Sequence, residues 1–162
     1  MIGMPNSKLL TIAVPAYNAA SYLHTCLDSL VRSGDEVEVL VVNDGSKDGT
    51  LQVARDYAER YPGVVVAVDQ ENRNWGGAVN HALELASGTF FYIVDSDDWL
   101  DSAKLTEVVS RLRMLEEQQA GVDLYMVNYV YNRVENGDRH TISYEKLLPS
   151  DKVVGWDAMS NP

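Results

Sequence analysis

Three carboxylates stand close together in the sequence, directly after an apolar segment. The segment FFYIV, residues 90–94, runs into Asp95, Asp97 and Asp98. Carboxylates this close repel one another, and they are costly to place at the end of a buried strand unless something positive pairs with them. Oxygen ligands suit Mg²⁺ or Mn²⁺, and Mg²⁺ usually takes one or two carboxylates together with substrate phosphates. The pattern therefore indicates a divalent cation as the partner.

The spacing of these aspartates predicts different directions for their side chains. In an extended chain, Asp95 and Asp97 are expected to point the same way and share one metal ion, while Asp98 faces elsewhere. The alternative interpretation is a solvated turn before a helix, and Asp101 is expected to cap that helix. The apolar strand before the cluster, and polar loops predicted at the same sheet edge, favour the metal site.

Asp44 is a second candidate, within VVNDGSKDGT at residues 41–50. Its run D-x-S-x-D-G-T resembles the start of an EF-hand loop, but Arg55 stands at the twelfth position, where that loop requires Glu. A tight turn between strand and helix, with Gly45 in an unusual conformation and Asp48 as the helix cap, explains most of the segment. The turn does not explain Asp44, which lies at the strand tip, where its side chain could hydrogen-bond a nucleobase or ribose.

The polar segment NRNWGGAVN, residues 72–80, is a third candidate. It lacks the G-x-G-x-x-G pattern of dinucleotide-binding turns, and the chain has no G-x-x-x-x-G-K-[ST] phosphate loop. Gly76 and Gly77 fit a flexible helix entry, or equally a loop over a bound nucleotide in which Arg73 contacts a phosphate or base. Trp75 could stack on a base or close the loop. Both interpretations stay open.

Apolar runs alternate with helical patterns along most of the chain. Strands are expected at 9–14, 37–42, 64–68 and 89–94, and helices at 23–31, 51–61, 78–86 and 102–119. Four strand-then-helix units in a row predict an α/β fold, Rossmann-like, with a mostly parallel sheet flanked by helices. A late β-hairpin is expected from 124–134 and 140–144, around Asn136-Gly137.

The expected strands end next to the polar segments. Ligands of such sheets bind beyond the carboxyl ends of the strands, where residues 15–18, 43–48, 69–77 and 95–98 are predicted to converge. At the helix ends, Ser21 or Asn18 is expected to cap the first helix, and Gly88 to follow the third as its C′ glycine.

Composition limits the classes of partner. The chain has 162 residues and a formal net charge of −11, which argues against a basic nucleic-acid-binding face. An acidic site can still hold a nucleoside diphosphate if a divalent cation lies between them. The longest apolar runs are too short for a membrane span. One cysteine, Cys26, fits a cytoplasmic setting and is expected in the core, with peripheral attachment at the inner membrane face left open.

Together these segments resemble the nucleotide-sugar glycosyltransferases of the GT-A fold, specifically the family 2 group. TIAVPAYN (11–18), VVNDGSKDGT (41–50) and NRNWGGAVNHALELASGTFFYIVDSDD (72–98) carry the likeness, which covers about residues 8–110. The resemblance implies transfer of a sugar from a nucleoside-diphosphate sugar, expected to be UDP-linked, to a carbohydrate or lipid-linked acceptor. It also implies a place in cell-wall or polysaccharide biosynthesis.

The same resemblance implies a nucleoside pocket. Asp44 would contact the base, usually uracil, and Arg73 lies where some members place a basic residue that contacts the base. The pocket would be lined by the residues that follow the first strand: Pro15, Ala16, Tyr17 and Asn18.

The resemblance further implies a metal site. Asp95, Ser96 and Asp97, with Asp98 following, would hold the ribose and the Mn²⁺ or Mg²⁺ that bridges the donor diphosphate. A metal held by Asp97 and Asp98, or by Asp95, would stabilise the charge that builds on the leaving group.

An inverting mechanism also requires a general base, which is expected beyond residue 162. We therefore expect residues 1–162 to be a single donor-binding domain, truncated before the acceptor-binding segment, that transfers sugar poorly or not at all. The alternatives are a sugar nucleotidyltransferase, a phosphotransfer domain with an aspartate nucleophile, and a non-catalytic nucleotide-binding domain. A sugar nucleotidyltransferase requires a glycine-rich, basic loop after the first strand, but VPAYNAAS has no glycine and no basic residue. A phosphotransfer domain requires its acids at the first strand, which here ends in Pro-Ala-Tyr-Asn.

Overall fold

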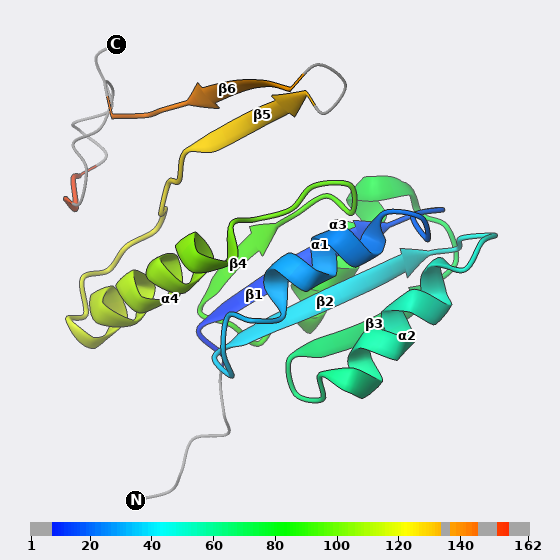
Figure 1. Ribbon diagram of the computed structural model, residues 1–162. Coiled ribbons are helices and arrows are strands. Elements are labelled where there is room, and N and C mark those ends of the chain that lie inside the picture. Colours follow the sequence, from blue (N-terminus) through cyan, green and yellow to red (C-terminus); the bar gives the residue numbers. More distant parts are fainter. Residues whose placement is uncertain (1–7, 134–136, 146–151, 156–162) are drawn as a thin grey trace, which may run out of the picture. The chain divides into compact units, whose positions relative to one another are not determined.

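The computed structural model describes residues 8–133, 137–145 and 152–155. The chain divides into two compact units, Met1–Met114 and Leu115–Pro162. The first unit holds a four-stranded parallel sheet with helices on its faces, and the second holds a two-stranded antiparallel hairpin (Figure 1). Within the described residues, no helix is both long and apolar enough to cross a membrane.

The sheet consists of four strands in the spatial order β3-β2-β1-β4. Their bounds are Leu10–Ala16 for β1, Val37–Asp44 for β2, Val65–Gln70 for β3 and Phe90–Ile93 for β4. The two central strands, β1 and β2, are buried along their whole length because both faces of the sheet are covered. The predicted α/β fold with a parallel sheet is confirmed.

Helices cover the two faces of this sheet. In Figure 1, α1 (Leu23–Leu30) and α2 (Thr50–Arg60) lie over one face, and α3 (Asn74–Leu85) lies behind the other. Against α3, Leu40 and Val42 of β2 pack on the small side chains of Ala78 and Ala82. Because alternate residues of a strand share a face, Asp44 continues the row of Leu40 and Val42 toward α3 at the strand end.

Helix α3 begins earlier than the sequence predicted. It starts at Asn74 rather than Ala78, so Trp75 belongs to its first turn and not to a loop. The Asn72 side chain accepts a hydrogen bond of 3.2 Å from Asn74 N at this entry. Such local bonds from an Asn side chain to the backbone start turns and helices, which explains the earlier start.

Gly88 does not have the predicted role of a C′ glycine. Helix α3 ends at Leu85, three positions before it, and Gly88 N donates a hydrogen bond of 2.9 Å to Thr11 Oγ1. A Cβ at Gly88 would lie 2.5 Å from Thr11 N, so the glycine is required by the close approach of this segment to β1.

The predicted caps of α1 are wrong. Neither Ser21 nor Asn18 caps the helix, which begins after Tyr22 without a side-chain cap. Instead, Ala19 O accepts hydrogen bonds from Tyr22 N at 3.1 Å and Leu23 N at 2.9 Å. A backbone turn therefore replaces the side-chain cap, and Asn18 is free to contact another loop.

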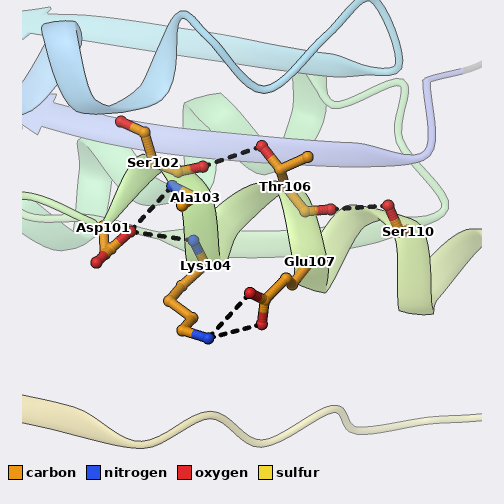
Figure 2. Close-up of polar contacts among 7 residues, drawn as sticks. All are labelled: Asp101, Ser102, Ala103, Lys104, Thr106, Glu107 and Ser110. Carbon is orange, nitrogen blue, oxygen red and sulfur yellow. Dashed lines mark hydrogen bonds and ion pairs between the residues drawn. The ribbon is translucent and has the colours of Figure 1, made fainter.

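Helix α4 spans Ser102–Glu117, close to the predicted range. Asp101 Oδ1 accepts hydrogen bonds from Ala103 N at 2.9 Å and Lys104 N at 3.1 Å (Figure 2). These bonds satisfy amide groups of the first turn, so the prediction that Asp101 caps this helix is confirmed.

The second unit contains the predicted hairpin. Strands β5 (Tyr129–Arg133) and β6 (Asp138–Ile142) pair in antiparallel register, with Tyr129 opposite Ile142. The hairpin is confirmed, with a first strand that begins at Tyr129 rather than at residue 124 and a second that covers residues 138–142 rather than 140–144. Asn136 and the end of the predicted first strand, Val134, lie outside the described residues.

Candidate functional site

A cleft of about 1150 Å³ opens at the carboxyl ends of the parallel strands. Its walls come from the last residues of β1, β2 and β3 and from the segments that follow the four strands. The predicted site residues that line it are Pro15, Ala16, Tyr17, Asp44, Asp95, Ser96 and Asp97. The strand order brings these segments together although up to 82 positions separate them along the chain (97 − 15 = 82).

Asn18, Arg73 and Asp98 are not among the lining residues. Asn18 joins two loops instead: its Oδ1 accepts from Lys47 N at 2.8 Å, and its own N donates to Ser46 Oγ at 3.0 Å. Asn18 has a positive φ of 50°, a conformation that Asn tolerates better than most residues. Its role in the described structure is therefore to fix the loops that form the wall of the cleft.

Asp44 is the most enclosed carboxylate of the cleft, with 3% of its surface exposed. Its Oδ1 accepts hydrogen bonds from Gln70 Nε2 at 2.6 Å and from Arg73 N at 2.7 Å. Among the described residues, Oδ2 has no hydrogen-bond partner. The carboxylate is thus held through one oxygen, and its second oxygen can accept from a ligand.

The segment after β3 wraps around Asp44. Asn72 Nδ2 donates to the main-chain oxygen of Asp44 at 3.0 Å, next to the two bonds on Oδ1. This approach requires Gly45, which has a φ of +68° and where a Cβ would lie 2.8 Å from Asn72 N. The predicted unusual conformation of Gly45 is confirmed, and its reason is both the backbone angle and the contact with the neighbouring loop.

Asp48 holds the turn that follows Gly45. Its Oδ1 accepts from Thr50 N at 3.0 Å, and its Oδ2 accepts from Ala20 N at 3.1 Å. The hydrogen bond from the Thr50 hydroxyl, followed by bonds from backbone amides, lowers the pKa of the Asp48 carboxyl. The prediction that Asp48 caps α2 is wrong in position, because Gly49 is the N-cap and has no side-chain cap bond. Asp48 stands one residue earlier and still accepts from an amide at the start of the helix.

Asn43 is buried beside Asp44 and lines the same cleft. Its Nδ2 donates to Asp69 Oδ1 at 2.7 Å, across the pairing of β2 with β3. Within the part of the chain that the structure describes, its Oδ1 is buried with no hydrogen-bond partner. A buried unpaired acceptor costs about 1–3 kcal/mol, so Asn43 Oδ1 is suited to accept from a ligand donor.

The acidic segment forms a turn rather than a continuation of the strand. Strand β4 ends at Ile93, and Asp98 N donates to Asp95 O at 2.9 Å. The extended backbone that the prediction assumed is therefore wrong, and strand alternation cannot be the reason for the side-chain directions. The turn nevertheless leaves Asp95 and Asp97 lining the cleft, with Asp98 outside the lining.

The carboxylates of this turn act on each other and on Cys26. Burial raises the pKa of the Asp98 carboxyl, and the charges of Asp97 and Asp95 raise it further. Burial, together with these three carboxylates, raises the pKa of the Cys26 thiol to about 12. Cys26 is fully buried on α1, so the thiol is a core side chain and not a nucleophile.

Trp75 contacts the acidic turn from the first turn of α3. Its Nε1 donates a hydrogen bond of 2.7 Å to Asp95 Oδ1. The indole also lines the cleft and is 54% exposed. Sequence reasoning left the role of Trp75 open and did not connect it with Asp95, because no pattern in the chain links positions 20 residues apart.

The donor set of the cleft fits a metal ion shared with a ligand. No group of three or more His, Cys, Asp or Glu side chains that could hold a metal by itself occurs among residues 8–133, 137–145 and 152–155. Asp95 and Asp97 supply two carboxylates at the cleft wall. Since Mg²⁺ commonly uses one or two carboxylates and completes its shell with phosphates and water, these residues fit such an ion.

Comparison with known proteins identifies the family of this chain. Residues 11–157 match the family described as Glycosyl transferase family 2. The protein named "Putative glycosyltransferase EpsH" of Bacillus subtilis is 33% identical over 160 residues, which is 91% of this chain and 44% of EpsH. The crystal structure of S. aureus TarS 1–349 in complex with UDP-GlcNAc has a TM-score of 0.59 and 31% identity, over 67% of this chain and 32% of that one.

A second solved structure adds a different nucleotide sugar. The mannosyltransferase PcManGT from Pyrobaculum calidifontis, in complex with GDP-Man and Mn²⁺, has a TM-score of 0.55 and 32% identity. The match covers 62% of this chain and 31% of that one. The chain spans less than half the length of each of these three proteins. From its sequence match and its sheet topology, the chain belongs to glycosyl transferase family 2 and has the GT-A fold.

Proposed function

We propose that this chain is the donor-binding part of a metal-dependent glycosyltransferase that uses a UDP-linked sugar. One observation carries the proposal: the cleft holds a buried carboxylate with a free oxygen, Asp44, together with the carboxylates of Asp95 and Asp97. A nucleoside diphosphate has the two features that these groups recognise, a base with an N–H donor and a charged diphosphate.

The Asp44 side of the cleft is proposed to bind the base. An ionised carboxylate only accepts hydrogen bonds, so Asp44 Oδ2 selects a base that offers an N–H. Uracil offers N3–H there, whereas cytosine offers an acceptor at the same position. Guanine also has a ring N–H, so GDP is the comparison that a test requires. The bound UDP-GlcNAc of TarS supports uracil.

Asp95 and Asp97 are proposed to bind the diphosphate through Mn²⁺ or Mg²⁺. Without a cation, a diphosphate would be repelled by these carboxylates and by a chain of net charge −11. When bound, the ion supplies Lewis-acid stabilisation of the departing nucleoside diphosphate. The Mn²⁺ of the PcManGT complex supports this assignment.

We also propose the stereochemistry of the transfer and the way in which the acceptor hydroxyl is activated. Transfer inverts the anomeric centre, and a general base deprotonates the hydroxyl of a carbohydrate or lipid-linked acceptor. Asp44, Asp95 and Asp97 are assigned to the donor, so none of these three is proposed as that base. Tyr17, which is 51% exposed at the cleft, is proposed to contact the nucleoside.

Thermal denaturation with nucleotides tests this function. The protein is heated with UDP, GDP or ADP, each with Mn²⁺ or with a chelator. A ligand at a hundredfold excess over its Kd stabilises the folded state by about 2.7 kcal/mol. The proposal predicts this stabilisation for UDP with Mn²⁺ and its loss with the chelator. The absence of stabilisation by every nucleotide, with or without Mn²⁺, would contradict it.

A further inference from the structure

A continuous chain of side-chain hydrogen bonds leads from α3 to the base side of the cleft. His81 Nδ1 lies 2.7 Å from Gln70 Oε1, and Gln70 Nε2 donates to Asp44 Oδ1 at 2.6 Å. The three residues come from α3, β3 and β2. Gln70 and Asp44 are also paired in the register of β3 with β2, so the backbone fixes their separation.

The chemistry of these groups dictates the direction of every bond. An ionised carboxylate has no hydrogen to donate, so the Gln70 amide must turn its NH₂ group toward Asp44. The amide oxygen then faces His81 and only accepts. His81 must therefore carry its proton on Nδ1, either as that neutral tautomer or as the imidazolium.

Asp44 and His81 each restrain one end of the Gln70 amide, so loss of the His81 donor leaves the bond to Asp44 as the remaining described restraint. Gln70 is partly exposed, and rotation of its amide by half a turn would place Oε1 against the Asp44 carboxylate. Two acceptors 2.6 Å apart would repel, which would displace the carboxylate from its position. Of the two donors described on Asp44 Oδ1, Gln70 Nε2 and Arg73 N, Arg73 N alone would then remain.

We propose that His81 is a positioning residue that sets the hydrogen-bond polarity of the base site. Through Gln70, its Nδ1–H keeps Asp44 oriented with Oδ2 as an acceptor for the N–H of the base. His81 thereby contributes to selection of the nucleotide although it is absent from the cleft lining. This inference rests on the proposed function, because it assigns a determinant of base selection within the same site.

The test measures selectivity for the N–H rather than affinity alone. Calorimetry with excess Mn²⁺ gives the Kd of UDP and of 3-methyl-UDP, whose methyl group replaces the N3 hydrogen. The proteins are wild type, His81→Leu and His81→Asn. Leucine removes the donor, whereas the asparagine amide can place a donor where Nδ1 stands. Circular dichroism and the melting temperature establish that each variant is folded.

We expect wild type and His81→Asn to bind UDP about tenfold or more tightly than 3-methyl-UDP, because a hydrogen bond to a charged group is strong. In His81→Leu the two Kd values should differ by about threefold or less, mainly because UDP binds more weakly. If His81 had a purely structural role, His81→Leu would weaken the binding of UDP and of 3-methyl-UDP equally. Equal weakening, or full selectivity in His81→Leu, would overturn the inference.

Nitrogen NMR tests the same inference without nucleotide. The imidazole of His81, assigned by its disappearance in His81→Asn, should carry a proton on Nδ1. A neutral ring protonated only on Nε2 would overturn the inference and leave the proposed function standing. Wild-type protein that binds neither nucleotide would overturn the proposed function, and this inference with it. Equal binding of both nucleotides by wild type would overturn this inference and the proposed contact of Asp44 with the base, and would leave the proposed metal-dependent binding of the diphosphate standing.

Discussion

Trp75 Nε1 donates a hydrogen bond of 2.7 Å to Asp95 Oδ1, which joins the first turn of α3 to the acidic turn after β4. Both residues line the cleft. The bond fixes one oxygen of Asp95 and leaves the other for a ligand or a metal ion. The carboxylate is therefore oriented by the protein before any ligand binds, which lowers the cost of binding.

Replacement of Trp75 by Phe should weaken metal-dependent UDP binding. The change keeps an aromatic wall and removes the N–H donor, so Asp95 loses its anchor. A net hydrogen-bond contribution of about 1 kcal/mol corresponds to about a fivefold increase in Kd. Calorimetry with Mn²⁺ measures the change. Trp99→Phe is the matched control, because Trp99 is 46% exposed and is not among the cleft residues. Equal affinities of the two variants would contradict this role.

Replacement of Asp44 by Asn should change which base the protein prefers. The asparagine can keep an oxygen toward Gln70 Nε2 and Arg73 N, and its amide nitrogen then takes the place of Oδ2. A donor replaces an acceptor, so affinity for UDP should fall by about tenfold or more. The ratio of Kd values for UDP and CDP, from the same calorimetric series, should shift toward CDP. An unchanged ratio would exclude a contact between Asp44 and the base.

Gly45→Ala should destabilise the protein more than Gly34→Ala does. Both glycines have positive φ values, +68° and +93°, so each alanine adopts a strained backbone at a cost of about 1–2 kcal/mol. Only at Gly45 does the new Cβ also meet Asn72 N, at 2.8 Å, whereas Gly34 has open space. Urea denaturation measures the free energy of unfolding of each variant. Similar losses of stability would show that the contact with Asn72 is unimportant.

Much of the fold follows from the sequence because its signals are local. The near-continuous apolar residues of β1 and β2 indicate buried parallel strands, and the polar segments after the strands indicate the cleft edge. The cap at Asp101 also depends only on neighbouring positions. These features need no knowledge of how distant segments meet.

The contacts within the site were not predictable in the same way. The pairing of Gln70 with Asp44 depends on the register of β3 against β2, which a single sequence does not reveal. Gly88 is set against Thr11 by a contact over 77 positions. The turn from Asp95 to Asp98 also replaces the extended chain that strand alternation assumed. In each case tertiary structure overrides the local pattern.

Cys26 should react with iodoacetamide only when the protein unfolds. Its thiol is buried, and its pKa is raised to about 12, so the reactive thiolate is scarce at pH 8. Mass spectrometry should show slow labelling of the native protein and rapid labelling in denaturant. Ligands that stabilise the fold should slow the labelling further. Rapid labelling of the native protein would contradict the assignment of Cys26 to the core.

The central claim is that Asp97, with a divalent cation, binds the diphosphate of UDP. Calorimetry of UDP with excess Mn²⁺ and with chelator, on wild type, Asp97→Asn and Asp101→Asn, tests it most directly. Asp101→Asn is the matched control because asparagine caps helices as well as aspartate does, and Asp101 is not among the cleft residues. We predict Mn²⁺-dependent binding in wild type and Asp101→Asn, and loss of the Mn²⁺-dependent part in Asp97→Asn, with all three folded. Equal Mn²⁺-dependent binding in Asp97→Asn and wild type would contradict the claim.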